Sequence, residues 1–194
     1  MNKPRYIDWL VEEKGLVVQG GHEVRSYRID YTDDSSVIDD WALHIRRNYI
    51  KDEDLNESAQ LNGLTVEQYL KMYIIPQKDE PLGATARSGD IAEIVVSDLL
   101  EFIMGYTVPR YKQMNRSGKN NSEHGTDVIG YKFYKPDKTP NERDELIATE
   151  VKAKLTSEDY DSLASAIEHS GKDEDRLART IDYCRKKLRY QNDS

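Results

Sequence analysis

The sequence predicts an α/β fold in which a small mixed sheet is flanked by helices. Apolar residues recur at helical spacing over residues 88–105. Residues 126–134 and 145–154 alternate between apolar and polar side chains, as strands do, and two further helical patterns follow at 160–168 and 172–189. Strands that stand between helices in this order favour a layered core of sheet and helices.

The predicted helix over residues 88–105 has recognisable ends. Ser88 is a candidate N-terminal cap, and Gly105 follows the last apolar residue. The side chains that must face a core are Ile91, Ile94, Val95, Leu99 and Phe102. Residues 106–111 resemble a strand, but Pro109 has no backbone N–H and confines it to an edge or a bend.

The first half of the chain predicts a separate region. Its expected elements are a strand within residues 22–31, a helix over 39–49, a polar connector over 51–63 and a helix over 65–73 that Thr65 caps. Residues 74–89 contain two prolines and two glycines, which is typical of a long loop. We therefore expect an N-terminal mixed α/β region, residues 1–80, and a second domain, residues 88–194.

The composition excludes several classes of protein. Of 194 residues, 37% are hydrophobic and 33% are charged, which allows a modest core under a polar surface. No apolar run approaches the roughly 18 residues of a membrane span, and the N-terminus does not resemble a signal peptide. Cys184 is the only cysteine. We therefore expect a cytoplasmic protein without an internal disulfide or a cysteine metal site.

Residues 145–154 carry the clearest chemical signal. Alternate side chains of a strand point to opposite faces, so Ala148, Glu150, Lys152 and Lys154 share one face, and small, mostly apolar residues share the other. Core packing explains an acid and two lysines on one face poorly. A catalytic cleft explains them well.

Phosphodiester hydrolysis needs such a set of residues. Mg²⁺ or Mn²⁺ takes oxygen ligands, which Glu150 and Asp127 can supply from neighbouring strands. Lys152 can orient the attacking water or stabilise the phosphoryl transition state. An upstream acid such as Asp127, followed on a later strand by an acid and a lysine two positions apart such as Glu150 and Lys152, is the PD-(D/E)xK pattern of metal-dependent nucleases. Each part also has a simpler interpretation, because Glu-x-Lys is common on half-buried strands and aspartate is common in turns.

Glu93 is the fourth candidate for the catalytic site. At about 100° per residue, Asp90, Glu93, Ser97 and Glu101 form a polar stripe beside the apolar face of their helix. One interpretation places Glu93 at the edge of the site, as a ligand of a metal-bound water or of a second metal. The other is that the stripe faces solvent.

Several basic residues are candidate DNA contacts. They are Lys112, Lys119, Lys154, Lys172 and Arg176. The last two lie near Ser170 and Asp173, either of which can cap the final helix, and the positive end of a helix suits a phosphate. The alternative is a capped turn with solvated charges. A formal net charge of −8 is unusual for a protein that binds DNA alone, so we expect a partner to bring the DNA.

Five segments occur in the order RSGDIAEIVVSDLLE, VPRYKQ, GTDVIGY, DELIATEVKAK and AIEHSGKDEDRLARTI. Together they resemble the HamA nuclease subunit of Hachiman anti-phage defence. The resemblance starts near Trp41 and is strongest from Ser88 onward. The chain stops soon after the last predicted helix, so further C-terminal elements of the family can be missing.

This resemblance implies a PD-(D/E)xK restriction-endonuclease-like core and metal-dependent DNA cleavage. The family's acid–x–lysine falls on Glu150 and Lys152, and its upstream acid falls on Asp127. The resemblance also implies a partner helicase, HamB, which restrains the nuclease until it senses phage or damaged DNA. The sequence has no Walker A motif, so an ATP-driven step would belong to the partner.

Three functions stay open at this point. The leading one is a nuclease effector of a two-component defence complex. The second is a non-catalytic module with the same fold that docks a helicase or DNA. The third is a restriction enzyme that acts as a homodimer.

Overall fold

The computed structural model describes residues 2–13, 24–110, 112–114, 116–121, 125–154 and 162–170, together with residues 178, 181, 182 and 185. The chain forms two compact units, Met1–Arg46 and Arg47–Ser194. The domain boundary expected between residues 80 and 88 stays a prediction. In the described part of the chain, no helix has the length and apolar character that a membrane crossing needs.

The first unit has an aromatic core. Its elements are η1 (Arg5–Trp9), β1 (Leu10–Glu13), β2 (Ser26–Ile29) and most of α1 (Ser35–Tyr49), and β1 pairs antiparallel with β2. Tyr6 stacks on Trp41 with ring centroids 4.5 Å apart, and Trp9 meets Trp41 edge-on at 6.4 Å. The strand expected within residues 22–31 is confirmed as β2.

The helix α1 begins earlier than the predicted residue 39. Asp34 Oδ1 accepts hydrogen bonds from the backbone N–H and the hydroxyl of Ser36, at 2.9 and 2.6 Å. An aspartate directly before a helix satisfies N–H groups that have no partner in the first turn. The sequence contained this capping signal, and the prediction missed it.

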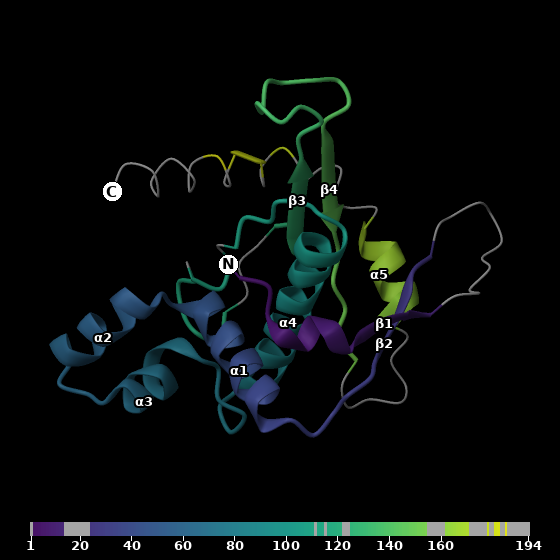
Figure 1. Cartoon of the computed structure of the whole chain (residues 1–194). Helices are drawn as coiled ribbons and strands as arrows, with labels where there is room; N and C mark the ends of the chain where they lie inside the picture. Colours follow the sequence, from purple (N-terminus) through teal and green to yellow (C-terminus); the bar gives the residue numbers. More distant parts are fainter. Residues whose placement is uncertain are drawn as a thin grey trace. The chain divides into compact units, whose positions relative to one another are not determined.

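The second unit combines helices with a β-hairpin (Figure 1). Its elements after α1 are α2 (Asp52–Leu61), α3 (Val66–Tyr69), η2 (Leu70–Ile74), α4 (Gly83–Asp98), η3 (Leu99–Ile103), β3 (Val128–Lys132), β4 (Glu145–Thr149) and α5 (Ser162–Ser170). The η2 and η3 turns are π-helical and continue α3 and α4. The predicted α/β class is confirmed.

The prediction of a connector over residues 51–63 is wrong, because this segment forms α2. Leu55 and Ala59, one helical turn apart, are both buried, so a helix gives this polar segment an apolar side. Its first turn holds three acidic residues, where the helix dipole favours negative charge. The next predicted helix is confirmed, and Thr65 caps it in a capping box with Gln68.

The helix α4 also begins earlier than predicted, so Ser88 lies inside it and is not its cap. The chain turns at Leu82, whose φ is 62°, and enters the helix at Gly83. A Cβ at Gly83 would lie 1.9 Å from the carbonyl oxygen of Gln77, so this close approach requires glycine. The predicted end is confirmed, because the chain turns at Gly105 with φ 75° after η3.

The strands β3 and β4 pair antiparallel, with Val128 opposite Thr149. Both predicted strands are confirmed, although β4 ends at Thr149 and not at residue 154. The strand expected at residues 106–111 is reduced to one bridge between Thr107 and Tyr131. The described residues contain two two-stranded antiparallel sheets, so a mixed central sheet of the restriction-endonuclease type stays a prediction.

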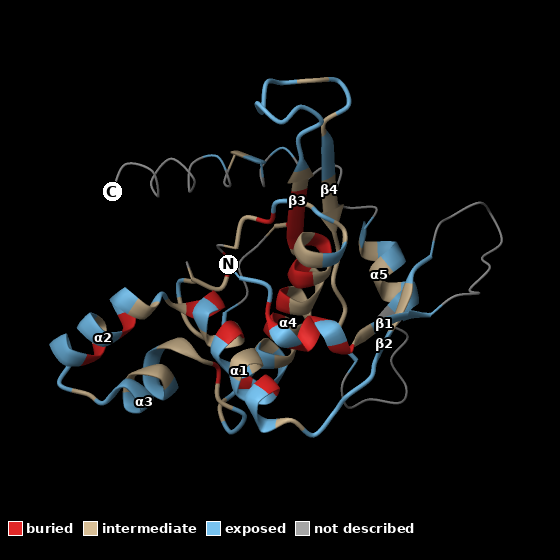
Figure 2. Cartoon of the chain, in the orientation of Figure 1, coloured by how far each residue is buried: buried red, intermediate tan, exposed pale blue. Residues whose placement is uncertain are grey.

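The core of the second unit lies between the hairpin and the end of the long helix (Figure 2). Leu100, Val108 and Val128 are buried together, and Ile147 and Val151 pack against them. The first three residues of β3 are buried, whereas its last residue is exposed. The buried end of the hairpin is therefore the end next to Asp127 and Glu150.

A buried ion-pair network fixes the chain that leaves this core. Arg110 donates hydrogen bonds to Asp98, Glu101 and the side-chain oxygen of Asn48. The side chain of Asp98 is fully buried, and that of Arg110 is 7% exposed. A buried carboxylate without its cation is costly, so Arg110 holds residues after Gly105 against α4.

We expect Arg110→Met to lower the free energy of unfolding by about 3–5 kcal/mol, because it leaves Asp98 as an unpaired buried charge. The measurement is urea unfolding followed by circular dichroism, since Trp9 and Trp41 both report on the first unit. Lys71→Met is the control, because it breaks an exposed pair with Glu67 and should cost about 1 kcal/mol or less. Equal losses for the two variants would contradict a structural role for Arg110.

Candidate functional site

Asp127 and Glu150 flank the buried end of the hairpin. Because Val128 lies opposite Thr149, Asp127 and Glu150 are the next residues outward on the two strands. Asp127 Oδ2 accepts a hydrogen bond of 2.8 Å from the N–H of Val151. The Asp127 carboxylate thereby joins the chain before β3 to the chain after β4. The structure brings the predicted acid and the predicted acid–x–lysine to one end of the hairpin.

Glu150 and Lys152 lie just after β4 and still share one side, as predicted. The Lys152 ammonium group donates to Glu150 Oε1, and the Glu150 side chain is 7% exposed. Val151, between them, packs against the apolar core. The strand-like alternation of side chains therefore continues beyond the last ladder hydrogen bond.

His169 of α5 is a neighbour of this pair that the sequence did not indicate. Its Nδ1 lies 3.4 Å from Glu150 Oε1, and its side chain is 40% exposed. In the sequence it is one histidine that directly follows the helical pattern predicted over residues 160–168. No spacing rule links a residue on α5 to the end of β4.

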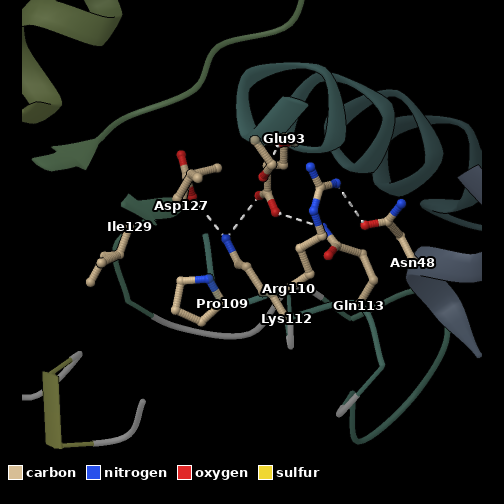
Figure 3. Close-up of a pocket in the computed structure, with 10 residues that line it drawn as sticks. Asn48, Glu93, Pro109, Arg110, Lys112, Gln113, Asp127 and Ile129 are labelled. Atoms are coloured by element: carbon tan, nitrogen blue, oxygen red, sulfur yellow. Dashed lines mark hydrogen bonds and ion pairs between the residues drawn. The ribbon is translucent and has the colours of Figure 1, made fainter. Parts of the chain in front are cut away.

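Glu93 belongs to a cluster that also includes Asp127 (Figure 3). Lys112 Nζ donates to Glu93 Oε1 at 2.8 Å and to Asp127 Oδ1 at 2.9 Å. Gln113 Nε2 donates to the other oxygen of Glu93 at 3.0 Å. The side chains of Glu93, Lys112 and Asp127 are only 12, 10 and 18% exposed. One lysine thus bridges two predicted site carboxylates.

The polar stripe of α4 faces the interior of the second unit and not solvent. Asp90 and Ser97 are buried, as is most of Glu93. Cations from the chain after η3 pair with the stripe and its neighbour Asp98. These pairs are Arg110 with Asp98 and Glu101, Lys112 with Glu93, and Arg116 with Asp90. The solvent-facing interpretation is wrong because the chain folds back along the helix.

A pocket open to solvent reaches the cluster (Figure 3). Its lining includes Glu93, Ser97, Arg110, Lys112, Gln113 and Asp127. Carboxylates that are nearly buried yet reachable from solvent are suited to binding a hydrated cation.

The charges of the cluster depend on one another. Burial raises the pKa of Glu93 to about 7, although the Lys112 ammonium group opposes the increase. Burial alone would lower the pKa of Lys112, but the carboxylates of Glu93 and Asp127 outweigh burial and raise it. Lys112 is therefore charged at neutral pH.

The donor set fits a hard divalent cation. Among the residues that the structure describes, no three histidine, cysteine, aspartate or glutamate side chains are placed to bind one metal ion. Mg²⁺, however, needs only one or two carboxylates, with water and phosphate oxygens as the other ligands. Glu93 and Asp127 already direct one oxygen each at a single cation, the Lys112 ammonium group.

The structure describes two of the remaining predicted DNA contacts, Lys119 and Lys154. Lys119 Nζ donates to Glu80 Oε1 at 2.5 Å and to the carbonyl of Lys71 at 2.7 Å. Lys154 is exposed. Lys172 and Arg176 lie outside the described residues. A role of these residues in DNA binding stays a prediction.

We expect wild type to lose stability relative to Glu93→Gln as the pH rises from about 5 to about 8 in EDTA. The folded-state pKa of about 7 exceeds the ordinary value of 4.5, so the folded protein binds the extra proton between these values. The stabilisation is complete below 4.5 and is lost as the pH rises through 7, by a total of about 3 kcal/mol. Melting temperatures across this pH range measure the difference. A difference that does not change with pH would contradict the raised pKa.

Comparisons with known proteins point to one family. The family model of HamA matches residues 4–194. Searches of curated proteins and of solved structures found no match. The extent of the family match leaves out only the first three residues. The chain therefore belongs to the HamA family, and this membership indicates a component of Hachiman antiviral defence.

Proposed function

We propose that this chain is a metal-dependent DNA nuclease of a two-component Hachiman system, which hydrolyses phosphodiester bonds under the control of a partner helicase. One observation carries the proposal: Asp127 and the Glu150–Lys152 pair meet at the same end of the β3–β4 hairpin. A PD-(D/E)xK active site would use these three side chains together. Family membership supports the defence role.

The proposed roles follow from the contacts of each side chain. Asp127 and Glu150 would hold Mg²⁺ or Mn²⁺, and Glu93 would supply a further carboxylate beside Asp127. The bound ion supplies an activated water and offsets charge on the phosphate. Lys152, next to Glu150, has an ammonium group that can turn to a phosphate oxygen and stabilise its developing charge. The N–H of Val151 holds Asp127 in place before any substrate binds.

A partner helicase would compensate for the weak electrostatic attraction between this chain and DNA. The formal net charge is −8, and nearby Lys112 and Lys152 are both paired with carboxylates. DNA phosphates would have to compete with those carboxylates. A helicase that already holds DNA would raise its local concentration at the site.

A second candidate is a non-catalytic module that docks a helicase or DNA. Two observations favour it: the described residues include no group of three metal-binding side chains, and Lys112 fills the space between Glu93 and Asp127. Measured cleavage separates the two candidates.

We expect the chain to nick or degrade plasmid DNA with Mg²⁺ or Mn²⁺, and Glu150→Ala/Lys152→Ala to reduce the rate by at least about 100-fold. The double variant removes a proposed metal ligand and the ammonium group beside it. The measurement is conversion of supercoiled plasmid on agarose gels, with EDTA as the metal-free condition.

Glu67→Ala/Lys71→Ala is the matched control for this experiment. It also removes one acid and one lysine that form an ion pair, but both side chains are more than half exposed on α3 and η2. Its cleavage rate should equal that of wild type. Unchanged cleavage by Glu150→Ala/Lys152→Ala would show that the site is assigned wrongly.

We expect a stable complex with the partner helicase, and slower cleavage of intact plasmid in that complex than by the free chain. The catalytic double variant should bind equally well, because Glu150 and Lys152 are mostly buried and paired with each other. Size-exclusion chromatography of the mixed proteins tests binding, and the plasmid assay tests restraint. Separate elution at micromolar concentration would argue against a two-component system.

A further inference from the structure

We infer that Lys112 occupies the cation position of a divalent-metal site formed by Glu93 and Asp127, so that the lysine and the metal ion exclude each other. The inference rests on the proposed function. It specifies which carboxylates receive a metal ion and what limits metal binding in the free chain.

The two carboxylates are oriented by neutral donors and converge through their other oxygens. Gln113 Nε2 binds Glu93 Oε2, and the N–H of Val151 binds Asp127 Oδ2. This leaves Glu93 Oε1 and Asp127 Oδ1, and both point at Lys112 Nζ (Figure 3). Glu93 Oε1 and Asp127 Oδ1 are therefore already held around one cation, the Lys112 ammonium group, without a metal ion.

The charge of the cluster favours a divalent ion over the lysine. When Glu93 is ionised, the two carboxylates around one ammonium group leave one negative charge, and all three side chains are at most 18% exposed. An uncompensated charge is costly where water is largely excluded. A divalent cation would balance the two carboxylates completely.

The two cations cannot bind together. Carboxylate oxygens bind Mg²⁺ at about 2.1 Å, so the ion would take the place of Lys112 Nζ, and a positive charge beside it would be repelled. Lys112 has a flexible side chain and lines a pocket open to solvent, so its ammonium group can leave. Once released, it stands at the site as a free cation for a DNA phosphate.

Glu150 is in a different situation. Its Oε1 already contacts Lys152 and lies 3.4 Å from His169. Lys112, in contrast, is shared between the carboxylates of Glu93 and Asp127. Asp127 connects the two halves of the proposed site, because its other oxygen contacts the chain next to Glu150.

The test is Mn²⁺ binding to the full chain without DNA, measured by electron paramagnetic resonance or calorimetry. If Lys112 leaves the carboxylates about 1–10% of the time, its removal should tighten binding about 10- to 100-fold in Lys112→Met. Lys71→Met is the control, because it removes the same charge from an exposed ion pair. Its affinity should equal that of wild type.

Lys112→Met leaves two carboxylates without their cation, so its melting temperature is measured in EDTA and in Mn²⁺. We expect it to melt below wild type in EDTA and to gain more from Mn²⁺ than wild type gains. Glu93→Gln is the second variant and should bind Mn²⁺ about tenfold more weakly than wild type, because it removes one ligand charge. If Lys112→Met folds neither in EDTA nor in Mn²⁺, the Mn²⁺ affinity of Glu93→Gln tests the inference by itself.

Two results would overturn the inference. One is Mn²⁺ affinity in folded Lys112→Met that does not exceed that of wild type, and the other is wild-type affinity in Glu93→Gln. Neither measurement needs DNA cleavage. If Lys112→Met binds Mn²⁺ more tightly than wild type but wild type does not cleave plasmid, the proposed nuclease is rejected and this inference is kept. If wild type cleaves plasmid but Lys112→Met does not bind Mn²⁺ more tightly, the proposed nuclease is kept and this inference is rejected.

Discussion

The second unit depends on the return of the chain along α4 after it turns at Gly105. Three cations of this returning segment meet carboxylates of α4 and η3 in nearly buried ion pairs. Buried ion pairs add little net stability compared with apolar packing, but removal of either partner is costly. They therefore restrict the segment to one path. Arg116 also lies over the ring of Tyr49, which donates to Asp90, so the end of α1 joins the same arrangement.

Asp127 connects this ion-pair surface to the hairpin. One of its oxygens accepts from Lys112 beside α4, and the other accepts from the backbone after β4. The apolar contacts of Leu100, Val108 and Val128 lie next to these polar contacts and hold the helix against the strand. The core and the candidate site are thus built from the same pair of elements. This explains how a small sheet can position acidic side chains from three separate segments.

The ion pairs also affect how the charged residues of this acidic chain can interact with DNA. The carboxylates of α4 are matched by internal cations, so part of the positive charge of the chain is used inside the second unit. Those basic residues are then less available to phosphates than the sequence suggests. In the proposed function, a partner would bring the DNA and a metal ion would change the pairing at the site.

The sequence by itself determined the α/β class, the two strands of the hairpin and the shared side of Glu150 and Lys152, because these follow from alternation along a few neighbouring residues. It also contained the signals for α2 and for the start of α1, which the prediction misread. Only the tertiary structure decided that Glu93 turns inward, that Lys112 bridges it to Asp127 and that His169 stands near Glu150. These contacts join residues far apart in the chain, and they depend on the path of the chain after Gly105 and on the position of α5, for which no local periodicity exists.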